Sequence, residues 1–293
     1  MKIKKSAGAA AFSAANTAAM LLLMAAALYP MVHVLFASIS NPTLVQQHRG
    51  LILHPLGFDL SAFKAVFNNP MIPVGYSNTL FYLVAGTAVN VLLTTLGAYA
   101  LSRKGLLLGK YFMFAIAFTM LFSGGMIPSY LLVRDLHMVN SRLALIIPNA
   151  ISAWNLIIMR TSFEAVPASM EESAKLDGAN DFIILFKIYV PLCLPVMAVM
   201  ILFYGVGHWN SWFSALLYIR KRELYPLQLV LREILLISTS DMTTNVTGGD
   251  AKANIGETIR YATIVVATAP ILCVYPFLQK YFVKGVMVGA IKG

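Results

Sequence analysis

Long apolar runs dominate this sequence and limit what the chain can fold into. Charged residues make up 12% of its 293 residues, against about 25% in a typical soluble domain. Several runs exceed the roughly 18 apolar residues that a helix needs to cross the hydrocarbon core of a bilayer. The sequence therefore predicts an all-helical integral membrane protein.

Six membrane-spanning helices are predicted, in a single domain that covers 1–293. The first apolar run is far longer than the roughly 7–15 residues of a signal-peptide core, so we interpret it as an uncleaved span. Basic residues beside the short connections favour a cytoplasmic location for both termini. The predicted spans are 9–39, 78–101, 110–132, 144–159, 194–219 and 261–282, with a charged loop at 163–193 and a long outer loop at 220–260.

The net charge of +10 raises the question of a nucleic-acid partner. In a membrane protein such an excess is explained by basic residues that flank the spans and face lipid headgroups. The basic stretches contain no interleaved aromatic side chains of the kind that stack on single-stranded bases, so no nucleic-acid partner is expected. Cys193 and Cys273 lie in apolar surroundings and indicate neither a disulfide framework nor a metal site.

One charged segment, 166–181, interrupts the apolar pattern. Ser169 followed by Glu172 is the pattern of a capping box, which predicts the start of a short helix. Gly178 can leave that helix with a positive φ. Asn180 or Asp181 can then begin a second helix, which Pro191 is expected to end. Two short helices joined at a glycine predict a rigid protrusion between two spans, suited to docking a partner.

The same segment resembles a loop found in the permease subunits of ATP-binding-cassette (ABC) importers, the EAA loop. The resemblance rests on Glu172-Ser173-Ala174, on Asp177-Gly178-Ala179, and on Pro191 and Pro195. The family pattern has alanine where Ser173 stands. The paired prolines are similar to the carbohydrate-importer branch, which includes the maltose permeases, and 275–293 is similar to the ending of permeases for oligosaccharides and uronates.

The resemblance implies the fold of type I importer permeases and a role for the segment as a coupling helix. In that family the coupling helix is seated in a cleft of a cytoplasmic ATPase subunit. The alternative interpretation is that Glu172 merely caps its own helix. The residues implied in ATPase coupling are Ser169, Glu171, Glu172, Ser173, Ala174, Asp177, Gly178, Ala179, Pro191 and Pro195.

Polar residues within the predicted spans are candidates for a substrate pathway, because unsatisfied polar groups in a span tend to face a bundle interior or a wet cavity. The sequence His208-Trp209-Asn210-Ser211-Trp212 lies in the predicted fifth span and resembles the Trp-Asn patch of carbohydrate permeases. Aromatic faces suit the C–H surfaces of sugars, and amides suit their hydroxyls. The alternative is hydrogen bonding between helices only. The candidates are Trp209, Asn210, Trp212, Asn90 and Asn155.

The predicted function is that of a permease subunit of an ATP-driven ABC importer for a carbohydrate, in the bacterial cytoplasmic (inner) membrane. An oligosaccharide is favoured, and similarity to uronate and alginate permeases and the basic outer flank favour an acidic one. The implied partners are a second, homologous permease subunit, two ATPase subunits and an extracytoplasmic solute-binding protein.

The chain has no phosphate-binding G-x-x-x-x-G-K-[ST] motif, so it is expected to be no enzyme and to hold no cofactor. ATP and Mg²⁺ would bind to the partner subunits. One alternative is an ABC permease for a non-sugar solute. Another is an intramembrane enzyme, which the five scattered histidines and the lack of H-E-x-x-H or G-x-S-x-G motifs disfavour.

Overall fold

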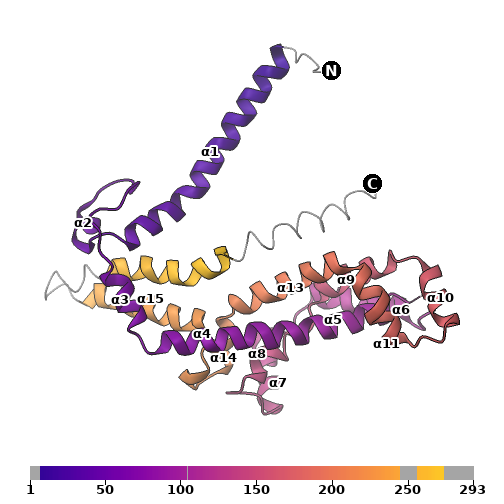
Figure 1. The fold of residues 1–293 in the computed structure, drawn as a ribbon. Coiled ribbons are helices and arrows are strands. Elements are labelled where there is room, and N and C mark those ends of the chain that lie inside the picture. Colours follow the sequence, from indigo (N-terminus) through magenta and orange to yellow (C-terminus); the bar gives the residue numbers. More distant parts are fainter. Residues whose placement is uncertain (1–6, 104, 245–255, 274–293) are drawn as a thin grey trace. The chain divides into compact units, whose positions relative to one another are not determined.

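The computed structural model describes residues 7–103, 105–244 and 256–273, which form helices joined by turns and loops (Figure 1). Those residues form no β-strand, only an isolated bridge between Ser40 and Phe58. The predicted all-helical fold is therefore confirmed. The helices are α1 (Ala7–Ser38), α2 (Pro42–Gln47), α3 (Ser61–Phe67), α4 (Met71–Phe81), α5 (Thr87–Leu101), α6 (Gly109–Leu121), α7 (Met126–Asp135), α8 (Leu143–Ile146), α9 (Ala153–Glu164), α10 (Ala168–Leu176), α11 (Asp181–Ile184), α12 (Val190–Leu192), α13 (Leu194–Trp209), α14 (Phe213–Tyr218), α15 (Leu227–Thr244) and a last helix over 256–273.

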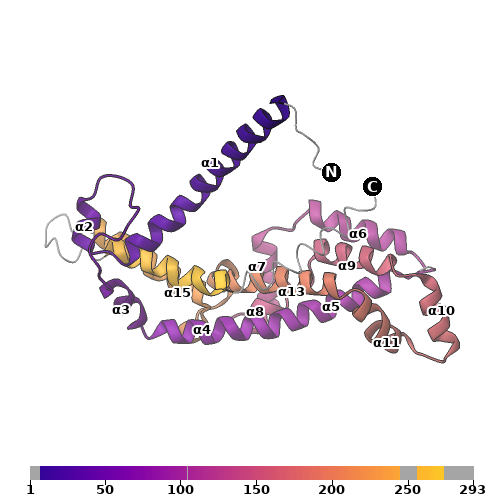
Figure 2. The same cartoon turned by 45° about the horizontal axis from the view of Figure 1, so that its top comes forward.

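The chain forms two compact units. The first comprises Met1–Asn69 with Leu231–Ala269, and the second comprises Pro70–Val230 with Pro270–Gly293. In the first unit a small core of Ala37, Val45 and Ile52 packs against Tyr261. The second unit holds the candidate functional residues, and Figures 1 and 2 place α10 and α11 at the end of this unit where α5 ends.

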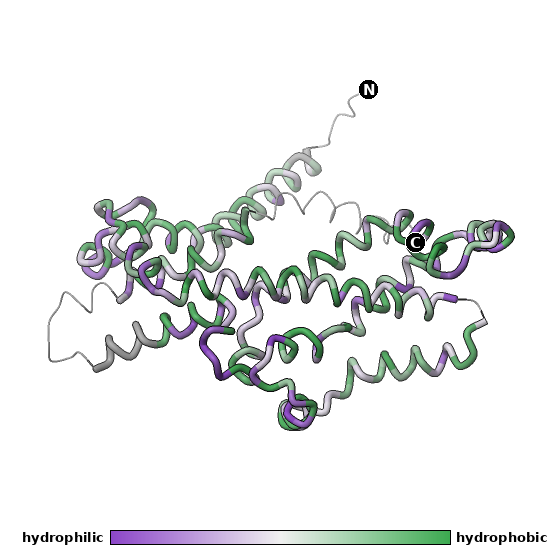
Figure 3. Tube along the Cα trace, turned by 60° about the horizontal axis from the view of Figure 1, so that its bottom comes forward, coloured by the Kyte–Doolittle hydropathy of each residue, from purple (hydrophilic) through white to green (hydrophobic). Residues whose placement is uncertain are grey.

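The helices α4 and α5 form one long rod, because a π-helical turn, η1 (Tyr82–Gly86), joins them without a break. The rod Met71–Leu101 and the segment Ala11–Ser38 of α1 are each long and apolar enough to cross a membrane. The rod begins seven residues before the predicted start of the second span, at residue 78. Figure 3 shows the hydrophobic residues along the long helices and hydrophilic residues gathered in the connections.

The predicted third span is broken between α6 and α7, in a segment that contains Gly124 and Gly125. The chain bends by 115° between α6 and α7. Gly125 in the break has φ +87°, a conformation that residues with a side chain rarely adopt. A second bent pair, Asp181–Leu192 with Leu194–Trp209, meets at 87°. If each bent pair is one span, the described residues contain four candidate spans, fewer than the six predicted.

The predicted fourth and fifth spans are wrong as continuous helices. Helix α8 ends at Ile146 and α9 begins only at Ala153, with Pro148 between them. Helix α13 ends at Trp209, and the chain becomes helical again at Phe213. The spans were predicted from the length of apolar runs, and that criterion passes over the few polar residues in the breaks, Asn149 in the first and Asn210 and Ser211 in the second.

The chain is already helical at residue 256, where its description resumes, five residues before the predicted sixth span. The rest of that span, 274–282, and the C-terminal segment 275–293 lie outside the described residues. The predicted outer loop 220–260 contains α15, an 18-residue helix that reaches Thr244. A helix of this length was not expected in a segment predicted to be a loop.

Candidate functional site

Helix α10 ends in a Schellman motif at the predicted glycine. Gly178 has φ +79°, and its N–H donates to the carbonyl of Lys175 at 3.0 Å, while the N–H of Ala179 donates to the carbonyl of Ala174 at 2.9 Å. This 6→1 and 5→2 pair satisfies carbonyls that a helix end leaves without partners. The predicted positive φ is confirmed, and the chain turns sharply between α10 and α11.

The predicted capping box at the start of α10 is wrong. Pro167 is the N-cap residue, and no side chain makes a cap hydrogen bond there. The proline holds the extended backbone that precedes a helix, so α10 begins before Ser169, which lies inside the first turn. Glu172 is exposed and does not cap the helix, which leaves its carboxylate facing outward.

The second short helix runs further than predicted. Asn180 caps it, with its Oδ1 accepting a hydrogen bond from the N–H of Ile183 at 2.9 Å. The helix α11 passes through a π-helical turn, η2 (Leu185–Tyr189), into α12, so Pro191 does not end it. Pro191 lies two residues after the π-helical turn, and the helix continues for one more residue, to Leu192. The break comes at Cys193, and Pro195 lies in the first turn of α13.

Helix α10 presents two different faces. Glu171 has a side chain only 17% exposed, and Ala174 and Ala179 pack against the core of the second unit. On the other side, Leu176 is 89% exposed, and Glu172, Ser173 and Asp177 are exposed beside it. Leu176 is thus an apolar side chain open to solvent, on a face of short side chains and carboxylates.

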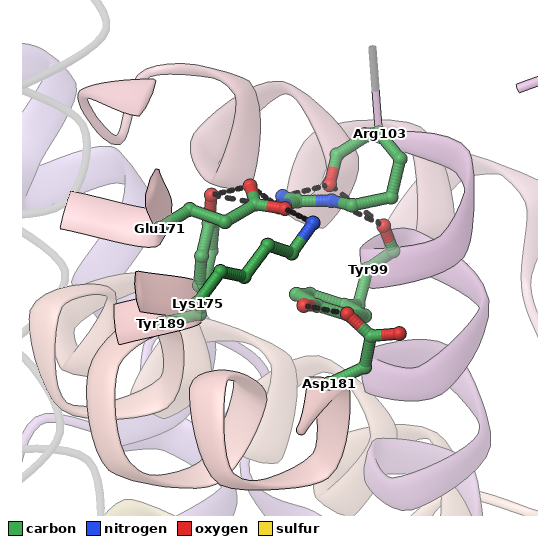
Figure 4. Close-up of polar contacts among 7 residues, drawn as sticks. Tyr99, Arg103, Glu171, Lys175, Asp181 and Tyr189 are labelled. Carbon is green, nitrogen blue, oxygen red and sulfur yellow. Dashed lines mark hydrogen bonds and ion pairs between the residues drawn. The ribbon is translucent and has the colours of Figure 1, made fainter. Parts of the chain in front are cut away.

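Arg103, in the turn after α5, joins the inner face of α10 to the rest of the second unit (Figure 4). Its guanidinium forms an ion pair with Glu171 and donates to the hydroxyl of Tyr189 at 2.8 Å. It also lies between two rings, 4.3 Å from the centroid of Tyr99 and 4.4 Å from that of Tyr189. Arg103 thereby contacts α5, α10 and η2 at once.

Three further bonds complete this network. The hydroxyl of Tyr189 donates to Glu171 at 3.1 Å, and the ammonium of Lys175 donates to Glu171 at 2.8 Å. The latter is the intrahelical pair that the spacing of the two residues predicted. The hydroxyl of Tyr99 donates to Asp181 at 3.4 Å. Each oxygen of Glu171 therefore has at least one donor.

The charges of this network stabilise one another. Burial raises the pKa of Glu171, but the hydrogen bond from Lys175 and the charge of Arg103 outweigh it, so the pKa lies below its usual value. Burial also lowers the pKa of Arg103, but the hydrogen bond to Tyr189 and the nearby Glu171 raise it overall. The ion pair is therefore fully charged near neutral pH.

A cavity of about 430 Å³ lies where the predicted fourth and fifth spans are broken. Its described lining residues carry mostly amide, hydroxyl, aromatic and imidazole side chains, and none of them is Asp, Glu, Lys or Arg. They are Asn90, Leu145, Asn149, Ser152, Asn155, Phe203, Tyr204, Gly207, His208, Asn210, Ser211, Trp212, Phe213 and Ser214.

Two buried side chains hold the break between α8 and α9 in place. The amide of Asn90, on α5, donates to the carbonyls of Asn149 and Ala150, each at 2.8 Å. The hydroxyl of Tyr204, on α13, accepts from the N–H of Ser152 at 3.1 Å. Irregular backbone at membrane depth is tolerated only where such partners satisfy it or a cavity hydrates it.

Asn90 also binds the opposite wall of the cavity, because its Oδ1 accepts a hydrogen bond from Nε2 of His208 at 2.6 Å. The His208 ring lies directly against Gly86, where a Cβ atom would collide with it. Asn90 thus connects α5 with both the α8–α9 break and α13, and it is completely buried.

Four of the five predicted substrate-pathway residues line this one cavity: Asn90, Asn155, Asn210 and Trp212. Trp209 does not line it. Its side chain is buried and packs against Tyr76, with ring centroids 6.4 Å apart. The Trp-Asn patch also lies at the end of α13 and in the break after it, and not in the middle of a span.

Arg103, Tyr189 and Tyr204 were not among the predicted site residues. Arg103 and Glu171 are 68 residues apart, so no local pattern connects them, and Arg103 was interpreted only as a basic flank of a span. For Tyr204 there was a signal, since it precedes His208 by one helical turn and therefore shares its face.

Comparison with known proteins identifies the family. Residues 88–288 match the family model described as the binding-protein-dependent transport system inner membrane component. A permease protein of a polygalacturonan/rhamnogalacturonan transport system from Bacillus subtilis (strain 168), YtcP, is 44% identical over 264 residues, which cover 90% of this chain and 92% of that protein. Protein LplC of the same organism is 41% identical, over 90% and 89% of the two chains.

A solved structure agrees with these relatives. A chain from the crystal structure of a bacterial ABC transporter involved in the import of the acidic polysaccharide alginate superposes with a TM-score of 0.86 and 35% identity, over 96% of this chain and 100% of that one. The family model and the 44% identical relative each cover most of the chain. The chain belongs to the family of inner-membrane components of binding-protein-dependent transport systems, the permease subunits of ABC importers.

Proposed function

We propose that this permease subunit conducts an oligosaccharide that contains acidic sugar residues, and that the cavity between α5, α9 and α13 is part of its path. The cavity carries the proposal. Its volume of about 430 Å³ is in the range of small-molecule sites. Its amide and hydroxyl groups suit sugar hydroxyls, and its aromatic rings suit the C–H faces of sugar rings.

Relatives support the acidic character of the substrate. The names of the similar proteins refer to polygalacturonan, rhamnogalacturonan and alginate. A basic loop in this chain also supports an acidic substrate. It is Arg220-Lys221-Arg222, and its side chains are exposed. Its backbone is fixed, because the N–H groups of Arg220 and Lys221 both donate to Oδ1 of Asn140, at 3.1 and 2.9 Å. A fixed cationic loop attracts an anionic oligosaccharide or an acidic binding protein.

The outer face of α10 is the proposed ATPase-docking surface, formed by Glu172, Ser173, Leu176 and Asp177. In this proposal two ATPase subunits bind ATP and Mg²⁺ and hydrolyse the ATP, and this chain needs no cofactor. A second permease subunit completes the pathway, and a solute-binding protein delivers the saccharide. Both termini and α10 lie on the cytoplasmic side.

Uptake by the assembled complex tests the substrate. The complex of both permeases and the ATPases is reconstituted into lipid vesicles with the binding protein outside and ATP inside. We expect accumulation of an oligogalacturonate and little of a neutral maltooligosaccharide of equal length. Uptake of the neutral sugar alone would refute the acidic preference. Uptake of an amino acid with neither sugar would favour the alternative, a permease for a non-sugar solute.

Docking is tested by two substitutions on the outer face, Glu172→Lys and Leu176→Asp. Each places an unfavourable charge at the proposed interface, so we expect loss of the ATPase subunits when the complex is purified through this chain. Asp135→Lys is the control, since Asp135 is exposed at the end of α7 and its charge changes equally. ATPase retained by both variants at the control level would refute the docking surface.

A further inference from the structure

We propose that Arg103 is a positioning residue that fixes the coupling helix α10 to α5, and that α5 carries the displacement of α10 to the cavity at Asn90. This inference rests on the proposed function, since it concerns how the motion of the ATPases reaches the sugar pathway. It assigns different roles to two adjacent glutamates: Glu171 binds within the chain, and Glu172 faces the partner.

The Arg103 end of this connection is built to resist displacement. The guanidinium lies between two aromatic rings, which prevents it from swinging out of plane. Its hydrogen bonds reach Glu171 on α10, the hydroxyl of Tyr189 on η2, and at 3.3 Å the carbonyl of Tyr99 on α5. Only arginine combines a permanent charge, a planar stacking surface and several donors in one group, so lysine is no equivalent here.

The Asn90 end binds both walls of the cavity. Helix α5 runs without a break from Thr87 to Leu101, and Asn90 is about 17 Å from Leu101 at about 1.5 Å per residue. At that distance Asn90 holds the carbonyls of the α8–α9 break and the His208 ring on α13. A shift of α5 along its axis therefore moves the groups that define the cavity.

The covalent routes from α10 are less direct. Toward α13 the chain bends by 87° at Cys193, and toward α9 it leaves the helix through Ala165–Pro167. A bend absorbs displacement by changing its angle, whereas a straight helix transmits it. The ion pair and hydrogen bonds of Arg103 directly connect the inner face of α10 to an unbroken helix that reaches the cavity.

The test is Arg103→Gln in the reconstituted complex, with Lys110→Gln as the control that removes an equal charge from an exposed residue at the start of α6. We expect both variants to retain the ATPase subunits and basal ATP hydrolysis. In Arg103→Gln the number of saccharides transported per ATP hydrolysed should fall at least roughly fivefold, the lower range of allosteric coupling. Hydrogen exchange of the amides 168–178 should also become faster.

A double substitution separates positioning from general stability. If Arg103 acts through Glu171, then Arg103→Gln with Glu171→Gln should be no worse than Arg103→Gln alone, and Arg103→Lys should restore only part of the ratio. Transport per ATP unchanged in Arg103→Gln would overturn the inference while leaving the proposed function intact. A wild-type complex that transports no saccharide would instead refute the proposed function.

Discussion

Two asparagines in the cavity lining are both buried, but their side-chain amides differ in their hydrogen bonds. Asn90 uses both ends of its amide, donating to two carbonyls and accepting from His208. Asn155 is 6% exposed, and within the described residues its side-chain amide makes no hydrogen bond, although it lines the cavity. The first amide is committed to the structure, and the second is available to a ligand.

The pair predicts opposite phenotypes. Asn90→Leu leaves the carbonyls of Asn149 and Ala150 and the His208 ring without their partner, so we expect the free energy of unfolding to fall by roughly 1–3 kcal/mol. Asn155→Leu removes no such bond and should leave the thermal midpoint of the purified protein nearly unchanged while raising the substrate concentration needed for half-maximal uptake. Equal midpoints for the two variants would contradict this assignment.

Glu171 makes the stability of the α10 region depend on pH. Its pKa in the folded chain is lowered, so the ion pair contributes stability above the ordinary carboxyl pKa of about 4.3 and loses it as the pH falls through the lower folded value. We therefore expect faster hydrogen exchange at 168–178, after correction for the intrinsic rate, only below about pH 4. Glu171→Gln should abolish that pH dependence, and a change near pH 6 would point to another group.

Among the secondary-structure elements, the sequence predicted the helices better than their breaks. Gly178 required a positive φ whatever surrounds it, and that prediction was confirmed. The break between α8 and α9 escaped notice because its stability depends on Asn90, more than fifty residues earlier. The start of α10 was misplaced because Pro167 set it, where Ser169 and Glu172 offered a stronger local pattern.

The bend after α10 can be tested at Gly178. Gly178→Ala places a Cβ atom at a φ of +79°, which costs about 1–2 kcal/mol in the left-handed region. We expect a weaker Schellman motif, lower uptake and unchanged membrane insertion. Gly178→Asn is the matched variant, because asparagine visits this region more readily, and it should retain more uptake than alanine. Open space surrounds the position within this chain, so a clash of the new side chain is not expected, and equal loss of uptake in both variants would contradict the role of backbone strain.

For the whole molecule, composition and the 166–195 segment predicted the fold class and the family, because a bilayer-spanning chain needs long apolar helices. The cavity was only partly predictable. Four of its residues were predicted from their place in apolar runs, but Trp209 does not line it, since a tryptophan side chain packs as readily against a neighbour such as Tyr76. The Arg103 network was not predictable, because it depends on residues that only folding brings together.

The helix break at 147–152 also bears on how the protein is made. During synthesis the ribosome releases Asn90 before Asn149 and Ala150, whose carbonyls it will bind. Tyr204, which binds the N–H of Ser152, emerges only later. A nascent chain that has delivered residues up to α9 already carries the amide that makes this interruption tolerable in lipid, so the order of translation supplies a partner for this backbone before the chain is complete.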